Sequence, residues 1–245
     1  NVGLSQMGRL EVTGPYALVF LQKTTTNNVA DLKIGQIQYS CMTMPHGGIV
    51  DDLLVYRMGD NEYMLVVNAS NIDKDFAWLQ SHLSGKVTLV DRSPETSLLA
   101  VQGPNAQKVV SKITDYDLAN MPYYTWARAN LAGAELLLSR TGYTGEDGFE
   151  MYIPPQHTNR MWKALMEAGN EFGMKLIGLG ARDSLRLEMK MALYGNDIDE
   201  TTTPVEAGLS WIVNFDKEFI GKPVLVRQRD EKPNRRLVCL ELIAE

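Results

Sequence analysis

The order of helix and strand patterns between residues 52 and 113 constrains the fold more than any other feature of the sequence. Apolar residues Ile72, Phe76 and Leu79 recur at the spacing of one helix face, with charged residues opposite. Strand patterns flank this helix on both sides, and the turn sequence MGDN joins the first two strands. The expected elements are strands at 52–57 and 62–67, a helix at 71–83, strands at 86–90 and 97–102, and a helix at 103–113. This β-β-α-β-β-α order predicts a split arrangement of the α+β class.

The rest of the chain also alternates strands and helices, without low complexity or a detectable repeat. Leu10 and Val12 share one face of a period-2 segment, and Gly14-Pro15 ends that strand and opens a short helix. A glycine-rich loop, TGYTGEDG, follows a predicted hairpin, and 195–208 is a polar stretch long enough to be functional. The further elements expected are strands at 8–13, 36–44, 124–131, 134–140, 149–153 and 236–243, and helices at 16–22, 158–172, 179–191 and from Pro223.

Composition and charge narrow the class of protein. The 245 residues are 44% hydrophobic and 22% charged, which is ordinary globular composition. The net charge of −6 offers no basic excess for nucleic acid or for a membrane surface. The three histidines are scattered and no Cys-x-x-Cys pair occurs, so no metal site is expected. Cys41 and Cys239 both lie in apolar, strand-like runs and are expected to be buried, reduced thiols.

Two adjacent acids, Asp51 and Asp52, are the first candidates for chemistry. They follow Gly47-Gly48 and precede an apolar run, and strand alternation sends their carboxylates to opposite faces. One carboxylate can then point inward, where the loss of hydration would raise its pKa unless a donor compensates. Such a group suits proton transfer or the binding of a cationic centre. From the residues alone, a surface pair beside a turn is the favoured interpretation.

Two later segments could hold a ligand. Arg182 and Arg186 share one face of a predicted helix that follows Gly178 and Gly180, but the third glycine of a dinucleotide fingerprint is absent. A salt-bridged surface helix is the favoured interpretation there. Glu150 follows the TGYTGEDG loop, where its two oxygens could accept N–H groups of a heterocycle, although a tight turn explains the segment equally well. The four tryptophans are expected in the core rather than as a stacking platform.

Seven segments, in one order along the chain, resemble the T-protein family of the glycine cleavage system. They are SQMG at 5–8, GGIVDD at 47–52, VVNASN at 66–71, LAVQGP at 99–104, RTGYTGEDG at 140–148, GARDSLRLE at 180–188 and LYGNDI at 193–198. Each segment is a modest signal alone, and together they span essentially the whole chain. The chain is therefore identified from its sequence as a member of this aminomethyltransferase family.

The resemblance implies an α+β, three-lobed fold that binds folate at its centre. Its lobes are a ferredoxin-like split β-α-β lobe, an antiparallel lobe and a C-terminal β-barrel lobe. We expect residues 1–45 with 120–215 to form the first lobe of the folate-binding core, and 46–119 to form the second, α+β lobe. Residues 216–245 would be a linker and the start of a β-barrel lobe that is largely missing. The last predicted strand, 236–243, would need a partner from that lobe.

The same resemblance implies an activity and its participants. Family members transfer the methylene of an aminomethyl group, carried on the lipoyl arm of H-protein, to tetrahydrofolate. Ammonia, methylenetetrahydrofolate and the reduced lipoyl arm are the products. Tetrahydrofolate is thus the expected cosubstrate and lipoylated H-protein the expected partner, with no metal, nucleic acid or membrane involved.

The positions of the family's functional residues carry over one by one. Asp52 matches the essential acid, Glu150 matches the acid that holds the pterin, and Arg182 matches an arginine that contacts folate. The residues that match the remaining lining of the folate pocket are Met7, Tyr39, Tyr56, Val66, Asn68 and Tyr143.

Some features depart from the family pattern. The family has Phe-Asp-Val between the positions of Leu4 and Ser5, and His in place of Gln6, so a loop is expected to be missing there. The chain opens on Asn1 without the family's glycine-rich start, so the natural N-terminus is also expected to be missing. No signal peptide is seen, and a cytoplasmic location is expected, or the mitochondrial matrix in a eukaryote.

Two alternative functions use the same pocket. A folate-dependent demethylase relative would differ in the TGYTGEDG and GNDIDE segments, and no such change is found. A non-catalytic folate-binding factor of the iron–sulfur maturation type would carry a Lys-Gly-Cys-Tyr motif, and the sequence has none.

Overall fold

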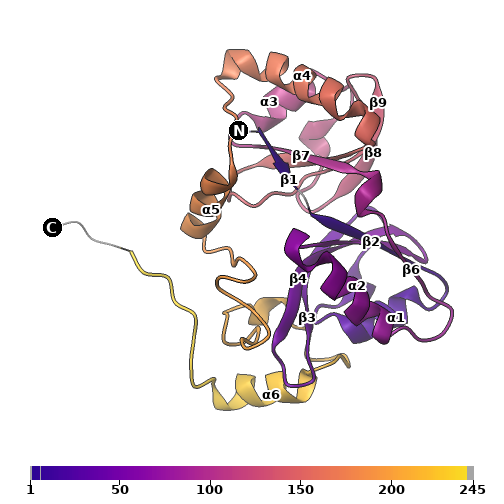
Figure 1. The fold of residues 1–245 in the computed structure, drawn as a ribbon, viewed down its shortest axis with the longest axis vertical. Helices are drawn as coiled ribbons and strands as arrows, with labels where there is room; N and C mark the ends of the chain where they lie inside the picture. Colours follow the sequence, from indigo (N-terminus) through magenta and orange to yellow (C-terminus); the bar gives the residue numbers. More distant parts are fainter. Residues whose placement is uncertain (1, 6, 242–245) are drawn as a thin grey trace.

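Two antiparallel sheets form the body of this computed structural model, which describes residues 2–5 and 7–241 (Figure 1). The first sheet has the strand order β3 (Ile37–Thr43), β4 (Ile49–Gly59), β5 (Glu62–Val67), β2 (Gly8–Thr13), β6 (Thr88–Asp91). The second sheet has the order β8 (Trp126–Leu131), β9 (Ala134–Ser139), β10 (Gly148–Ile153), β7 (Ser97–Gln102), β1 (Val2–Ser5). Every strand pair in both sheets is antiparallel.

The two sheets repeat one topology that the sequence does not reveal. In the first sheet, β2 is followed by α1 (Ala17–Thr24), three strands, α2 (Ile72–Ser81) and the edge strand β6. In the second, β7 is followed by α3 (Ala106–Ser111), three strands and α4 (Thr158–Gly169), and β1 fills the edge position that β6 has in the first. Each unit is a ferredoxin-like split β-α-β arrangement with one added strand, so this part of the predicted fold is confirmed and occurs twice.

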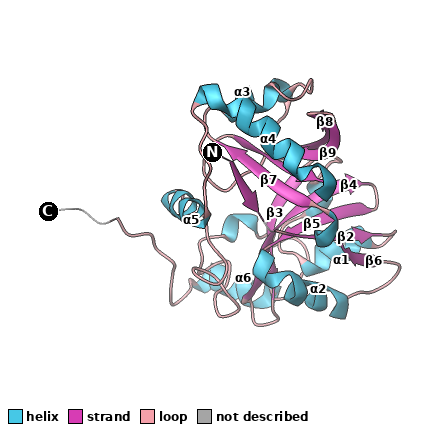
Figure 2. Cartoon of the chain, turned by 45° about the horizontal axis from the view of Figure 1, so that its top comes forward, coloured by secondary structure: helices cyan, strands magenta, loops and turns pink. Residues whose placement is uncertain are grey.

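Helices cover the outer face of each sheet, and the inner faces pack together. Figures 1 and 2 show α1 and α2 against the first sheet and α3 and α4 against the second. Each helix pair encloses a core of its own with its sheet. A third cluster joins the inner faces of both sheets and contains Ile37, Tyr56, Val66, Leu98, Leu137 and Tyr152. Two helical layers therefore enclose two sheets, with an apolar contact between the sheets.

Strand β4 shows how the sequence produces this layering. Leu53 and Val55 belong to the core under the helices, whereas Leu54 and Tyr56 belong to the cluster between the sheets. Because successive side chains of a strand point to opposite faces, a strand buried on both sides reads as a continuous apolar run. The same alternation places Asp51 on the helix side and Asp52 on the inner side.

The chain after α4 closes one side of the gap between the sheets. Helix α5 (Leu179–Glu188) lies beside the second sheet, and α6 (Lys222–Glu231) lies below the first (Figure 1). Between them, the segment around Asp199 is tied to β4, because the Ile49 amide donates to the carbonyls of Asp199 and Thr202. Single 3-10 turns lie at Val29–Asp31, Ala69–Asn71, Ser93–Glu95, Leu118–Asn120, Pro155–His157, Asn170–Phe172 and Ser210–Ile212. No helix in the described part of the chain is long and apolar enough to cross a membrane.

Two expectations from the sequence need correction, and one strand was not predicted. The lobe boundaries expected at 45/46 and 119/120 do not follow the sheets. The boundary at 45/46 separates β3 from β4, which pair in one sheet, and the boundary at 119/120 separates α3 from β8, which belong to the same unit. Local patterns do not reveal long-range pairs such as that of β2 with β5. The strand at Val2–Ser5 was not predicted. The strand expected at 236–243 is absent from 236–241, and its last two residues lie outside the described residues.

A buried hydroxyl pair across the two sheets gives a test of this fold. The hydroxyls of Tyr56 on β4 and Tyr152 on β10 are 2.8 Å apart, and both side chains are buried. Tyr56→Phe should lower the free energy of unfolding by about 1–2 kcal/mol in urea denaturation, because it removes a buried partner. The double variant with Tyr152→Phe should lower the free energy of unfolding by less than twice the loss in Tyr56→Phe, because it leaves no buried hydroxyl without its partner.

The chain supplies a matched control for that experiment. The Tyr63 hydroxyl is buried without a hydrogen-bond partner among the described residues, so Tyr63→Phe removes an unsatisfied group and should leave the free energy of unfolding unchanged or higher. Equal losses for Tyr56→Phe and Tyr63→Phe would contradict a contribution from the hydroxyl pair.

Candidate functional site

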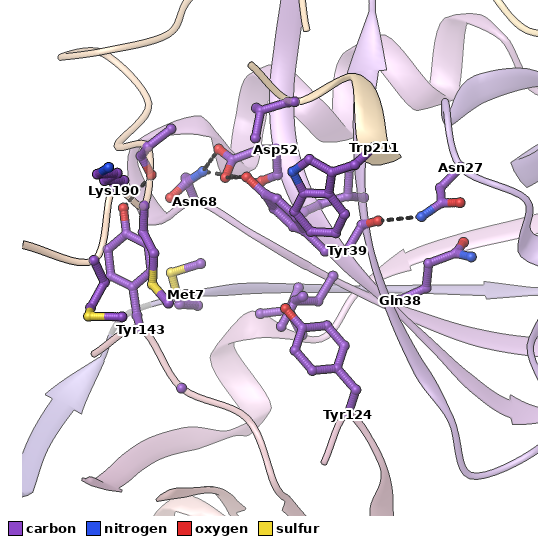
Figure 3. Close-up of a pocket in the computed structure, with 18 of the residues that line it drawn as sticks. Met7, Asn27, Gln38, Tyr39, Asp52, Asn68, Tyr124, Tyr143, Lys190 and Trp211 are labelled. Carbon is purple, nitrogen blue, oxygen red and sulfur yellow. Dashed lines mark hydrogen bonds between the residues drawn. The ribbon is translucent and has the colours of Figure 1, made fainter. Parts of the chain in front are cut away.

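A cavity of about 740 Å³ lies between the two sheets, beside the apolar contact that joins them. Its volume is within the usual range for small-molecule sites. The first sheet contributes side chains from β3, β4 and β5, the second contributes β10 and the loop before it, and the chain from α5 to residue 211 closes the side. Figure 3 shows Asp52, Tyr39 and Asn68 on one wall, with Tyr143 and Met7 across from them. The site therefore draws on segments from most of the chain.

Asp52 is the acid on the first-sheet wall of this cavity, and two donors hold its carboxylate. The Tyr39 hydroxyl donates to Oδ2 at 2.8 Å, and the Asn68 side-chain amide donates to Oδ1 at 2.9 Å. Tyr39 and Asp52 lie on paired strands, since Cys41 is the direct partner of Asp52. Burial, followed by the negative charge of Asp51, raises the pKa of Asp52 to about 6, and the two hydrogen bonds limit that rise. Asp52 can therefore exchange a proton near neutral pH.

Asp51 lies on the opposite face of β4 and is fully buried. Its carboxylate accepts from the Asn68 backbone at 3.0 Å, from the Asn68 side chain at 2.9 Å and from the Asn71 side chain at 2.7 Å. The Asn68 amide thus bridges both acids. The expected split of the two carboxylates to opposite faces is confirmed, and the favoured interpretation as a surface pair is wrong, because α2 and the turn before it cover Asp51.

Glu150 is the acid on the opposite, second-sheet wall. It lies on β10 between Ala100 of β7 and Ser139 of β9. Thr141 donates to its Oε2 at 2.5 Å. Burial raises the pKa of Glu150, and the Thr141 hydrogen bond and the charge of Arg182 oppose that rise. Two carboxylates from different sheets therefore line one cavity, with Asp52 and Glu150 on separate walls.

Helix α5 brings a cation to the cavity, beside an aromatic ring from the loop before β10. The Arg182 guanidinium lies 4.5 Å from the centroid of the Tyr143 ring, and the Tyr143 hydroxyl donates to the Ala192 carbonyl. Arg186, by contrast, is buried and pairs with Asp183 and Asp197. The expectation of a salt-bridged surface helix is therefore confirmed for most of α5, whose residues are largely exposed, whereas Arg186 is buried and fixes α5 to the following segment.

Trp211 was expected in the core, and that expectation is wrong. Its side chain is 70% exposed, lines the cavity and lies with its ring 5.8 Å from that of Tyr39 (Figure 3). Tyr123 and Tyr124 add further aromatic surface to the lining. Aromatic faces of this kind suit a flat heterocycle, because stacking adds to the area that is buried.

The structure brings together most of the residues predicted from the sequence. Those that line the cavity are Met7, Tyr39, Asp52, Val66, Asn68, Tyr143, Glu150 and Arg182. Tyr56 does not line it, because its hydroxyl is turned to Tyr152 and Ser139 in the apolar contact between the sheets. The lining residues that sequence reasoning missed include Asn27, Gln38, Tyr123, Tyr124, Lys190 and Trp211. Most of these lie in loops, which give no periodic signal.

The cysteines and the metal-binding side chains add little to the site. Cys41 is buried as expected, whereas Cys239 is exposed, so the expectation for Cys239 is wrong. Within residues 2–5 and 7–241, no group of three or more His, Cys, Asp or Glu side chains is placed to hold a metal ion.

Comparison with known proteins gives a consistent result. Residues 2–217 match the family described as GCVT N-terminal domain. The chain is 52% identical over 243 residues to an aminomethyltransferase of Bacteroides thetaiotaomicron, which covers 98% of this chain and 67% of that protein. It is 50% identical over 240 residues to an aminomethyltransferase of Halothermothrix orenii, with the same coverage of both chains.

A solved structure agrees with these sequence matches. The crystal structure of the glycine cleavage system aminomethyltransferase T of Bartonella henselae superposes with a TM-score of 0.86 at 33% identity, over 96% of this chain and 65% of that one. This chain thus spans about two thirds of the length of these relatives. Taken with the shared fold and the cavity between its two sheets, these matches show that the chain belongs to the aminomethyltransferase family of glycine cleavage T-proteins.

Proposed function

We propose that this protein transfers the methylene of an aminomethyl group to tetrahydrofolate bound in the cavity between the sheets. The observation that carries the proposal is Asp52, a carboxylate held by Tyr39 and Asn68 on the wall of a cavity large enough for a folate. Family membership supports the reaction class.

The chemistry asks for an acid with the properties of Asp52. The C–S and C–N bonds of the aminomethyl group break, and two new C–N bonds join its carbon to two folate nitrogens. One folate N–H proton passes to the departing sulfur and one to the departing amino group, so that a thiol and ammonia leave. A carboxylate beside those nitrogens orients the N–H group and stabilises the positive charge that develops during attack. With a pKa raised to about 6, Asp52 is mainly a carboxylate at neutral pH.

The opposite wall suits the other parts of folate. Glu150 offers carboxylate oxygens at the second sheet, which fits the paired N–H donors of a pterin ring. Arg182 lines the same cavity from α5 and would attract the acidic tail of folate. The aromatic pair of Tyr39 and Trp211 provides an apolar wall beside Asp52.

The aminomethyl donor would be the lipoyl arm of H-protein. The lipoyl arm is long and apolar, and the exposed side chains of Trp211 and Met189 offer apolar surface at the cavity. The relative from Bartonella henselae belongs by its description to the glycine cleavage system, which supports this choice of partner.

The direct experiment supplies the chain with tetrahydrofolate and aminomethyl-loaded H-protein and measures methylenetetrahydrofolate and ammonia together. Equal amounts of both products are expected. Folate binding without either product would indicate a non-catalytic folate-binding factor, and transfer from an N-methylated amine instead would indicate a demethylase.

Removal of the Asp52 carboxylate should stop the transfer. Asp52→Asn is expected to lower kcat at least about 100-fold, as for loss of a positioned acid–base group, and to change folate affinity little. The kcat and the dissociation constant for tetrahydrofolate are to be measured for this variant and for Asp60→Asn, an exposed acid in the turn after β4. Normal turnover in Asp52→Asn would remove Asp52 from the mechanism.

The pH profile of the native protein follows from the same group. Because the carboxylate is the active form and its pKa is raised to about 6, kcat should be level above pH 7 and should fall below pH 6. The fall should approach about tenfold per pH unit, and Asp52→Asn should abolish this dependence. A profile whose acid limb lies near pH 4 would contradict the raised pKa.

Replacement of Glu150 should weaken folate binding more than it changes the fold. Glu150→Gln keeps the shape but loses one accepting oxygen, so calorimetry should show folate affinity lower by about tenfold or more. Glu146→Gln, on the exposed tip of the preceding loop, is the matched control. Unchanged affinity in Glu150→Gln would contradict a role in holding the pterin.

A further inference from the structure

Asp75, on α2 behind the cavity wall, is a buried acid that the proposed reaction does not use. Its side chain is fully buried, and neither carboxyl oxygen has a hydrogen-bond partner among the described residues. An ionised carboxylate without donors in such a position would strongly destabilise the fold. The buried position therefore favours the neutral acid, whose O–H needs an acceptor.

Among the charged groups that act on Asp75, Asp51 is the suitable acceptor. The charged groups that act on it are Asp51, Lys74 and Asp52. The Lys74 ammonium is directed elsewhere, since it donates to the Val50 carbonyl and the Tyr194 hydroxyl at 2.6 Å each. Asp51 is also fully buried, and its carboxylate has room for a fourth donor beside the three from Asn68 and Asn71.

We propose that Asp75 is a neutral carboxylic acid that donates its proton to Asp51, and that this buried pair positions Asn68 and, through Asn68, the carboxylate of Asp52. The protonation of Asp75 is independent of the proposed function, whereas the effect on Asp52 during transfer rests on it. Asp75 is a positioning residue, because it touches neither the cavity nor the substrate.

The hydrogen bonds trace the connection from α2 to the cavity. Asn68 donates to Asp51 through its backbone amide and its side chain, and the same side-chain amide reaches Asp52 at 2.9 Å. A change in the Asp51 carboxylate would therefore move the group that holds Asp52. Burial first, and the adjacent Asp51 second, raise the pKa of Asp75 to about 10, which agrees with a neutral acid at physiological pH.

The first test measures stability against pH and needs no activity. In the unfolded chain Asp75 has its ordinary pKa of 3.8, so the native protein must take up a proton on folding at any pH between that value and the raised one. The contribution of Asp75 to the stability of the native protein is therefore present at low pH and is lost as the pH rises. Asp75→Asn supplies an N–H donor that does not titrate. Urea denaturation should therefore show the folding equilibrium constant of Asp75→Asn gaining on the native protein by up to about tenfold per pH unit between pH 5 and pH 8.

The slope of stability against pH in that experiment decides the outcome, whatever the stability of Asp75→Asn at any single pH. Asp73→Asn, an exposed acid two residues earlier on α2, should show no such trend. Parallel stability curves for Asp75→Asn and the native protein would overturn the proposal. Should Asp75→Asn fail to fold, the carboxyl carbon resonance of Asp75 in native protein at pH 7 takes over the test, and an ionised group there would overturn the proposal.

The second test separates donation from simple filling of space. If Asp75 only fills a buried space, Asp75→Leu should be the milder change, because apolar replacements of buried acids are often tolerated. If it is a donor, Asp75→Asn should keep kcat within about threefold, whereas Asp75→Leu should lower kcat at least about tenfold with little change in the KM for folate. Equal kcat values in both variants would overturn the positioning role. A native protein without transfer activity would reject the proposed function alone and leave the pH test of stability standing.

Discussion

The apolar contact between the two sheets is the interaction on which the rest of the molecule depends. Tyr56, Val66 and Leu137 bury part of each inner face, so the sheets are held together there and remain apart beside it. Because packed interiors deform little, the contact fixes the separation across which Asp52 and Glu150 line one cavity. Each acid is thus positioned by its own sheet, and the separation between the two acids is set by the contact between the sheets.

Asn68 connects this architecture to the chemistry. It follows the end of β5, and its side-chain amide lies between an acid of the inner face and an acid of the outer face of β4. Two carboxylates on adjacent residues repel each other, and donors shared between them offset part of that repulsion. The arrangement leaves Asp52 with a raised pKa while fixing its direction. One amide therefore both stabilises the end of the strand and orients the Asp52 carboxylate.

Local signals predicted the elements well, and they failed where distant segments meet. The β4–β5 hairpin and α2 followed from turn chemistry and apolar spacing, and the resemblance to the T-protein family placed eight residues that line the cavity. The repeat of one topology in both sheets was invisible, because the use of β1 as the last strand of the second sheet depends on long-range pairing.

Trp211 was misassigned for the same reason, since its exposure is set by how the chain after α5 returns to β3. Tyr56 lies on a suitable strand and face, but the contact between the sheets, which no local pattern reveals, removes it from the lining.

The acids near the cavity show where stability and function compete. A fold selected for stability alone would place apolar side chains at 51 and 75, since both are buried at the boundary of the core under α1 and α2. The chain instead keeps acids at both positions, in a region where Asn68 and Asn71 supply donors to one of them. Such a cluster costs stability at neutral pH, because one acid must hold its proton on folding. The polar network therefore serves to orient the Asp52 carboxylate rather than to stabilise the core.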